Sequence, residues 1–284
     1  MLECVPNVAE GRAGGVLDAL AAACGASLLD LHVDADHHRS VFTLAGPADG
    51  DAADAVRALA RAVAAQLDVR GHDGVHPRLG ALDVVPFVAL GEPAGAAVAP
   101  ARTFATWLAA ELGVPSYLYD AADPARRTLP AVRRAAAAGV APDVGPDRPP
   151  SRLGGVAVGA RAPLVAVNCW LAQPDLVVAR QLATAVRERD GGLPGVRALA
   201  FELPSQHAVQ VSLNVTDLDA TGVEAACEAV RARADAAANP VTRVEWVGLV
   251  PEAELERCSP AFRRWSGLDR SRTIEARLAG AARP

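Results

Sequence analysis

The stretch Arg70-Gly-His-Asp-Gly-Val-His-Pro-Arg-Leu-Gly-Ala-Leu-Asp-Val-Val-Pro-Phe87 joins a polar loop to an apolar run. Residues 81–88 are nearly all apolar, which is typical of a strand buried on both faces. Two glycines in the loop let its backbone bend and approach a ligand closely. Pro77 excludes a regular helix through His76, because the residue before a proline is driven toward extended conformations. The stretch therefore predicts a covered strand, preceded by a loop that presents an imidazole beside charged groups.

Around this strand, hydrophobic periodicity predicts the same succession of elements twice. The first half has expected strands at 2–5, 27–33, 40–45 and 82–88, and helices at 14–24 and 48–66. The second half has expected strands at 164–171, 196–203, 209–215 and 241–247, and helices at 174–188 and 221–237. Both halves follow the order β-α-β-β-α-β of a ferredoxin-like unit. We therefore expect an α/β (α+β) fold of two duplicated ferredoxin-like lobes, with a ligand groove between them.

Between the two series the composition changes. A helix at 101–112, a strand at 116–119 and a short helix ending at Gly139 are predicted first. Residues 142–155 then carry four prolines and three glycines, which indicates a linker or a ligand-wrapping loop. We place the domain boundary there and expect domains at 1–148 and 149–284. The tail, 251–284, is polar and predicted to be partly helical.

Charge and cysteine content exclude several classes of function. The chain has a net charge of −5 and no lysine among its 28 basic residues, so a nucleic-acid partner is not expected. Its five cysteines are widely spaced and odd in number, which favours reduced thiols in a cytoplasmic protein. Acidic residues near the N-terminus argue against a signal peptide, and prolines and a glutamate interrupt the longest apolar segment. We expect a cytoplasmic protein without a membrane partner.

His72 and His76 have the spacing of paired metal ligands, but that spacing places both side chains on one side only in a helix. The glycines and Pro77 argue against a helix, so we interpret His72 as a loop histidine bonded to backbone. No nucleophile elbow, phosphate-binding loop or dinucleotide fingerprint occurs in the chain. The residues alone thus indicate a two-lobed α/β enzyme with a histidine acid/base and arginines that bind carboxylates.

A second histidine pair, His37 and His38, lies in a turn beside Asp34 and Asp36. A metal site that also includes Asp83 is one interpretation of this turn. The favoured interpretation is a solvated Asx-type turn between two strands. We therefore expect no metal.

Several motifs resemble the glutamate formiminotransferase family, over roughly residues 2–257 and in the same order. In the first half they are Glu3-Cys-Val-Pro-Asn-Val-Ala-Glu-Gly-Arg12, Asp34-Ala-Asp-His-His-Arg-Ser-Val-Phe-Thr43, Gly74-Val-His-Pro-Arg78 and Val114-Pro-Ser-Tyr-Leu-Tyr119. In the second half they include Gln210-Val-Ser-Leu-Asn-Val-Thr-Asp217 and Glu245-Trp-Val-Gly-Leu-Val-Pro251. Val75 stands where the family usually carries glutamate.

The resemblance implies transfer of the formimino group from N-formimino-L-glutamate to tetrahydrofolate, in histidine degradation. The products are 5-formiminotetrahydrofolate and glutamate, and His76 is the implied catalytic acid/base. The implied folate-binding segment is Gly145, Pro146, Asp147, Arg148, Pro149, Pro150, Ser151, Arg152, Leu153 and Gly154. Candidates for substrate binding are Arg78, Arg39, Asp34, Asn7 and Asp83, with structural ion pairs as the equally open alternative for the arginines.

Two other functions stay open at this point. One is a folate-binding homologue without turnover, and the other is a metal-dependent hydrolase of a formimino compound that uses His72, His76 and the Asp34/Asp36 turn. The expected partners are formiminoglutamate and tetrahydrofolate, the latter as acceptor substrate. A separate cyclodeaminase that acts on the product is also expected, because the chain ends before such a domain could begin, and a homodimer is left open.

Overall fold

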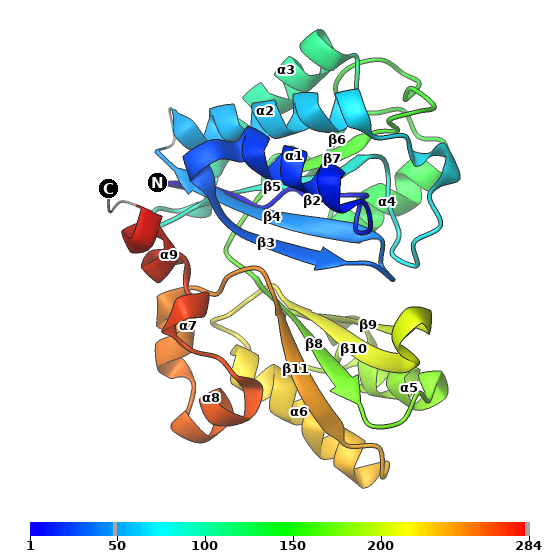
Figure 1. Ribbon diagram of the computed structural model, residues 1–284, viewed down its shortest axis with the longest axis vertical. Helices are drawn as coiled ribbons and strands as arrows, with labels where there is room; N and C mark the ends of the chain where they lie inside the picture. Colours follow the sequence, from blue (N-terminus) through cyan, green and yellow to red (C-terminus); the bar gives the residue numbers. More distant parts are fainter. Residues whose placement is uncertain (48–49, 282–284) are drawn as a thin grey trace. The chain divides into compact units, whose positions relative to one another are not determined.

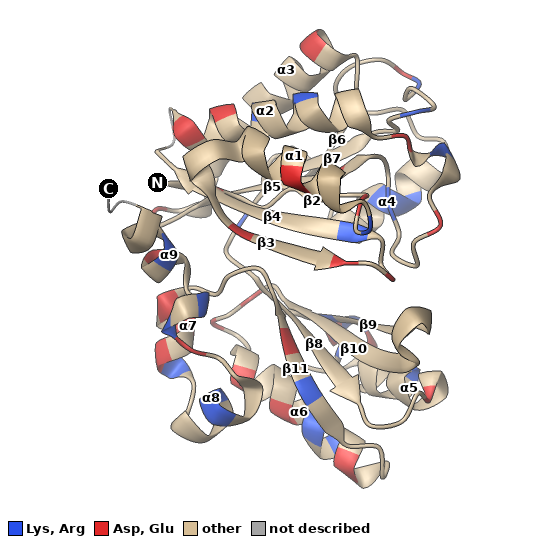
Figure 2. Ribbon diagram, viewed as in Figure 1, with Lys and Arg blue, Asp and Glu red and all other residues tan. Residues whose placement is uncertain are grey.

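The computed structural model describes residues 1–47 and 50–281 of the chain. They form two compact units, which we call unit 1 (Met1–Ala162) and unit 2 (from Pro163 onward). Each unit contains one β-sheet covered by helices (Figure 1). The inner strands of the unit 1 sheet are largely uncharged, and most charged positions lie on helices, loops and strand ends (Figure 2). Within the described ranges, no helix is long and apolar enough to cross a membrane.

Unit 1 contains the first predicted series of elements. They are β1 (Leu2–Cys4), α1 (Gly14–Cys24), β3 (Leu28–Asp34), β4 (Arg39–Gly46), α2 (Asp51–Gln66) and β5 (Leu82–Ala89), with β2 (Asn7–Val8) continuing the line of β1. Both β1 and β2 pair antiparallel with β4 and with β5, and β3 pairs with the outer edge of β4. The predicted order β-α-β-β-α-β is confirmed. The expected start of the second helix, at residues 48–49, lies outside the described residues.

Four further elements extend unit 1: α3 (Val98–Leu112), β6 (Ser116–Asp120), α4 (Leu129–Ala137) and β7 (Val156–Arg161). Strand β7 was not predicted, and it lies between β5 and β6, parallel to both. Its interior holds Gly159, where a Cβ atom would come within 2.3 Å of the Tyr119 ring. The glycine thus marks a close approach of two strands, which weakens the local strand pattern.

This strand also moves the domain division. The compact units divide after Ala162, whereas the composition had placed the boundary between residues 148 and 149. The difference arises because β7 returns the chain to the first sheet after the proline-rich segment. That segment is therefore a loop within unit 1.

Helices cover both faces of the unit 1 sheet around β5. Val85 and Phe87 of this strand belong to the core cluster formed with α2 and α3. Val84, on the opposite face, packs with Val132 of α4. Every residue of β5 is buried, as the apolar sequence predicted, so the strand is a rigid base for the loop before it.

Unit 2 contains the second predicted series. Its elements are β8 (Val165–Leu171), α5 (Leu176–Val186), β9 (Val196–Leu203), β10 (Ala208–Val215), α6 (Val223–Ala236) and β11 (Val241–Val247). The sheet order is β11-β8-β10-β9, with every pairing antiparallel. The corresponding strands of unit 1 have the same spatial order, which agrees with a duplicated series. The tail forms α7 (Glu252–Arg257), α8 (Pro260–Ser266) and α9 (Ile274–Ala281), and residues 282–284 lie outside the described residues.

Candidate functional site

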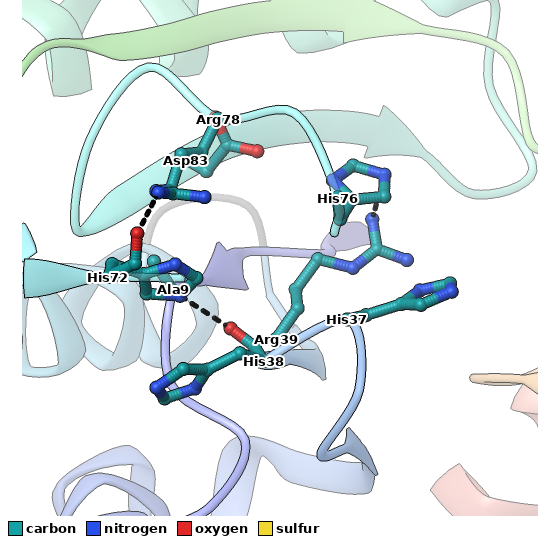
Figure 3. A pocket seen from close by; sticks show the side chains of 8 residues that line it. All are labelled: Ala9, His37, His38, Arg39, His72, His76, Arg78 and Asp83. Carbon is teal, nitrogen blue, oxygen red and sulfur yellow. Dashed lines mark hydrogen bonds between the residues drawn. The ribbon is translucent and has the colours of Figure 1, made fainter. Parts of the chain in front are cut away.

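A small hollow lined mainly by polar side chains lies in unit 1, where the loop before β5 meets the turn between β3 and β4. Figure 3 shows the side chains that line it. They are Ala9, His37, His38, Arg39, His72, His76, Arg78 and Asp83. The structure thus brings the predicted acid/base together with three of the predicted substrate-binding residues.

Glycines let the backbone segments around the hollow approach closely. A Cβ atom on Gly74 would lie 2.3 Å from the carbonyl oxygen of His37, and one on Gly11 would lie 2.2 Å from that of Asp34. The turn itself is closed by the Asp34 carboxylate, whose Oδ1 accepts from the backbone N–H of His37 at 2.7 Å. These contacts hold the turn and the loop together, and they support the Asx-type interpretation of the turn. The turn is not solvated as predicted, because the side chains of Asp36 and His37 are buried.

The ring of His72 joins the loop before β5 to the turn between β3 and β4. Its Nε2 lies 2.8 Å from the carbonyl oxygen of His38 and must donate, while its Nδ1 accepts from the N–H of Gly74 at 3.2 Å. Its ring also stacks on that of His38, with 4.2 Å between the centroids. Burial lowers the pKa of His72 and that of His38, so both rings favour the neutral form. The predicted role of His72 as a backbone-bonded loop histidine is confirmed.

His76 has a defined tautomer. Its Nδ1 lies 2.8 Å from the carbonyl oxygen of Pro77, which can only accept, so the proton sits on Nδ1. Its Nε2 lies 3.0 Å from Nη1 of Arg39, which can only donate. Burial, and after it the cations Arg39 and Arg133, hold the pKa of His76 well below its ordinary value near 6.5. The imidazole is therefore neutral, and its basic nitrogen is Nε2.

Arg39 begins β4 and connects His76 to β2. Its Nη1 also donates to Oδ1 of Asn7 at 3.0 Å. Burial lowers the pKa of the Arg39 guanidinium to about 10. Within residues 1–47 and 50–281, no carboxylate lies within 4.0 Å of this guanidinium, although Asp83 and Asp34 act on it from further away. A partly buried arginine without a carboxylate partner is costly, and a ligand carboxylate would compensate for that cost.

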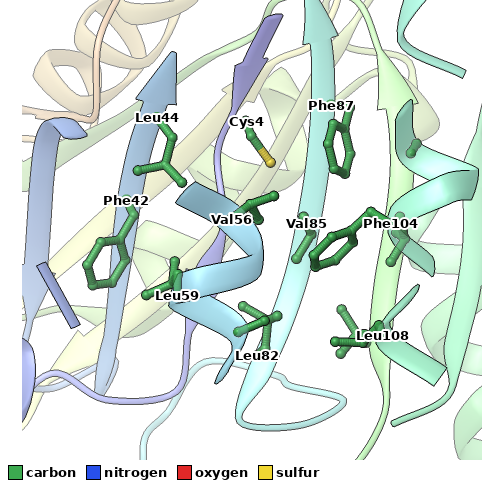
Figure 4. Close-up of a cluster of buried hydrophobic side chains, with 14 of the residues drawn as sticks. Cys4, Phe42, Leu44, Val56, Leu59, Leu82, Val85, Phe87, Phe104 and Leu108 are labelled. Atoms are coloured by element: carbon green, nitrogen blue, oxygen red, sulfur yellow. The ribbon is translucent and has the colours of Figure 1, made fainter. Parts of the chain in front are cut away.

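Asp83 and Arg78, two of the predicted substrate-binding residues, instead hold the loop. Asp83 is 1% exposed, and its Oδ1 accepts from the N–H of Leu79 at 2.7 Å. It stands at the start of β5, whose next residues pack in the core shown in Figure 4. Arg78 donates to the carbonyl oxygens of Gly74 and His72. Both side chains are thus committed to internal partners.

Arg133, on α4, is a residue of this region that the sequence did not identify. Its Nη2 lies 2.6 Å from Oδ2 of Asp83, and its Nη1 donates to the Pro77 carbonyl at 3.0 Å. That carbonyl is the one that accepts from His76. Basic positions on α4 and at the start of β4 are visible in Figure 2. The sequence shows Arg133 only as an arginine in a short predicted helix. It does not indicate which distant residues this arginine contacts.

The predicted folate segment lies beside the same loop. Near its end, the carbonyl of Leu153 accepts from the N–H of Ala81 at 2.8 Å, and that of Arg152 accepts from the N–H of Val69 at 3.0 Å. Gly154 has φ +69°, and a Cβ atom there would lie 2.3 Å from the Leu79 carbonyl oxygen. Residues 145–149 are exposed to solvent. The segment thus reaches both ends of the loop that carries His76, but none of its described residues lines the hollow.

In the part of the chain that the structure describes, no group of three or more His, Cys, Asp or Glu side chains is placed to hold a metal ion. At the turn between β3 and β4, the Asp34 carboxylate contacts the side chain and the backbone N–H of His37, and the ring of His38 lies 3.6 Å from the Glu10 carboxylate.

Comparison with known proteins gives consistent matches. The model of the formiminotransferase domain, N-terminal subdomain, matches residues 1–161, and that of the formiminotransferase domain matches residues 166–267. Glutamate formimidoyltransferase of Thermoplasma acidophilum is 35% identical over 99% of this chain and 98% of its own. The protein of the same name from Streptococcus pyogenes is 34% identical over 90% of both chains. Formimidoyltransferase-cyclodeaminase of Rattus norvegicus is 35% identical over 88% of this chain and 50% of its own. The chain belongs to the formiminotransferase family.

Proposed function

We propose that this chain transfers the formimino group from N-formimino-L-glutamate to tetrahydrofolate, giving 5-formiminotetrahydrofolate and glutamate. Two relatives that match at least nine-tenths of their own length bear the name glutamate formimidoyltransferase. The observation that carries the proposal is the pairing of His76, with its fixed tautomer, and Arg39, a partly buried cation that has no carboxylate within 4.0 Å among the described residues. One group can move a proton, and the other can bind a carboxylate of the donor.

The reaction needs one nitrogen to lose a proton and another to gain one. N5 of tetrahydrofolate attacks the amidine carbon of the donor, and a tetrahedral intermediate forms. The carbon–nitrogen bond to glutamate then breaks, and the departing nitrogen takes up a proton. Nε2 of His76 is the atom suited to take the proton from N5 and pass it to the departing nitrogen, because Nδ1–H is held by Pro77.

For the remaining predicted residues we propose different roles. Arg39, supported by Asn7, is the better candidate for a donor carboxylate, since the contacts of Arg78 are to loop carbonyls. The segment 145–154 is proposed to contact tetrahydrofolate. The support for this role is its exposed first half, residues 145–149, and its hydrogen bonds to residues on either side of the loop that carries His76.

We also propose a cytoplasmic location, since all five cysteines are free and buried. A cyclodeaminase would act next on the product, as the names of the bifunctional relatives suggest.

The proposal is tested by incubating the purified protein with formiminoglutamate, with and without tetrahydrofolate, and measuring glutamate and the formiminofolate. We expect both products only when tetrahydrofolate is present. Glutamate release without folate would indicate a hydrolase, and chelator treatment would show whether that activity depends on metal. Folate binding without any glutamate release would indicate a homologue without turnover.

A further inference from the structure

We propose that Arg39 is a specificity-determining latch on His76, released by the carboxylate of the donor. By the latch we mean the hydrogen bond from Nη1 of Arg39 to Nε2 of His76. A donor with a carboxylate would draw the guanidinium away and free Nε2, whereas a donor without a carboxylate would leave Nε2 hydrogen-bonded to Arg39. This inference rests on the proposed function and adds to it the way in which donor binding and proton transfer are coupled.

Both ring nitrogens of His76 are engaged in hydrogen bonds. Nδ1 donates to Pro77 at 2.8 Å, and Nε2 accepts from Arg39 at 3.0 Å. The lone pair of Nε2 is the one that has to take a proton from the attacking nitrogen. With Arg39 in this position the base is therefore blocked, and it must be released before reaction.

The direct partners of the Arg39 guanidinium among the described residues are neutral. Its contacts in the described residues are the imidazole of His76 and the amide oxygen of Asn7. The nearest acidic side chains have partners of their own, since Asp83 pairs with Arg133 at 2.6 Å and Asp34 closes its turn. A carboxylate carries the opposite charge and can accept two parallel hydrogen bonds from a guanidinium, which the neutral imidazole and amide cannot, so an arriving carboxylate is the better partner.

Charged and titratable groups from three elements face the His76 imidazole. His76 faces Arg39 from β4, Arg133 from α4 and His37 from the turn before β4, with Asp83 and Asp34 further away. Of the two arginines, Arg133 is held by Asp83, and Arg39 contacts Nε2 directly. Withdrawal or neutralisation of Arg39 therefore raises the pKa of His76 toward its ordinary value and makes it a stronger base.

The direct test is an NMR titration of the His76 ring, assigned by comparison with His76→Gln. Glutamate serves as the probe, because it carries the carboxylates without the amidine. In the wild-type chain we expect saturating glutamate to raise the pKa of His76 by at least one unit. In Arg39→Ala the pKa should already be raised in the free protein and should not respond to glutamate. The exposed Arg134→Ala, which removes a cation from α4, is the matched control and should behave like the wild type.

Should Arg39→Ala fail to fold, Arg39→Gln removes the charge while it keeps a polar side chain of similar length. An unchanged His76 pKa in either variant would overturn the proposal, as would a wild-type pKa that ignores glutamate.

A kinetic test uses formamidine as a donor without carboxylates. We expect Arg39→Ala to lower kcat/KM for formiminoglutamate at least tenfold, and to raise it several-fold for formamidine, because the base is no longer capped. An equal loss with both donors would contradict the latch. A wild-type chain that releases no glutamate with tetrahydrofolate present would overturn the proposed function instead. The NMR titration needs no turnover, so it tests the latch independently of that function.

Discussion

Arg133 and Asp83 form a largely buried ion pair, with 2.6 Å between Nη2 and Oδ2, although 50 positions separate them in sequence. The pair links α4 to the start of β5. Through its second nitrogen Arg133 also donates to the carbonyl of Pro77, which accepts from His76. A buried pair thus fixes the position of the atom that sets the tautomer of the proposed base.

We expect Asp83→Ala to lower the free energy of unfolding by about 3 kcal/mol, because it leaves the Arg133 cation without its partner in a largely buried setting. The measurement is urea unfolding at neutral pH. Asp73→Ala is the control, since it breaks the exposed ion pair with Arg12 and should hardly move the unfolding midpoint. An equal effect of the two substitutions would show that the buried pair contributes little.

The pH dependence of stability should reflect the histidines around the hollow. Burial lowers the pKa values of His38, His72 and His76 in the folded chain, so the unfolded chain binds protons at higher pH than the folded one. Their contribution is therefore fully present above pH 6.5 and is lost progressively as the pH falls below it.

Urea unfolding at pH 7, 6 and 5 measures this dependence. We expect the wild type to lose stability over this range and His76→Gln to lose less, since it removes one of the groups that must be protonated. A wild-type free energy of unfolding that stays constant from pH 7 to pH 5 would contradict the assignment of neutral histidines.

Local pattern was enough to predict much of the fold. Helix α1 and strand β11 have the bounds that their periodicity predicted, because each places an apolar face on its own core. Strand β7 was not predicted, because a glycine weakens the strand pattern at its centre. Gly159 is needed there only because the ring of Tyr119, on a neighbouring strand, leaves no room for a Cβ atom. The domain boundary was misplaced for the same reason.

The candidate site could be predicted only in part. The histidine and arginine motifs marked the loop and the turn, and the structure places them around one hollow. The contacts of Arg133 depend on how α4 packs against β5, which no local pattern contains. Asp83 was a candidate for substrate binding, and its burial and its ion pair with Arg133 follow from that same packing.

The proposed folate segment can be tested at Gly154. Substitution by alanine places a Cβ atom 2.3 Å from the Leu79 carbonyl oxygen, at a positive φ that disfavours any side chain. We expect Gly154→Ala to displace the segment and to weaken tetrahydrofolate binding at least tenfold by isothermal titration. Gly95→Ala, where a Cβ atom meets nothing within 4 Å, is the matched control.

Hydrogen exchange gives an independent measure of the same role. Tetrahydrofolate should protect the exposed part of the segment, residues 145–149, because these residues have few contacts of their own in the free chain. Unchanged exchange at saturating folate, together with normal binding by Gly154→Ala, would exclude the segment from the folate site.

His76→Gln tests the proposed acid/base most directly. Glutamine retains a polar side chain but cannot carry a proton between two nitrogens, so turnover should fall about 100- to 10,000-fold. Tetrahydrofolate affinity should stay within a few-fold, because the loop is held by Arg78, Asp83 and Gly74 rather than by the imidazole. Turnover is measured as glutamate release, and affinity by titration of the same preparation.

His207→Asn is the control. It lies at an exposed position of unit 2 with φ +48°, which asparagine tolerates, and it should keep full activity. Near-normal transfer by His76→Gln would place the acid/base elsewhere, and among the residues lining the hollow His37, whose ring centroid lies 5.8 Å from that of His76, would be the next to replace.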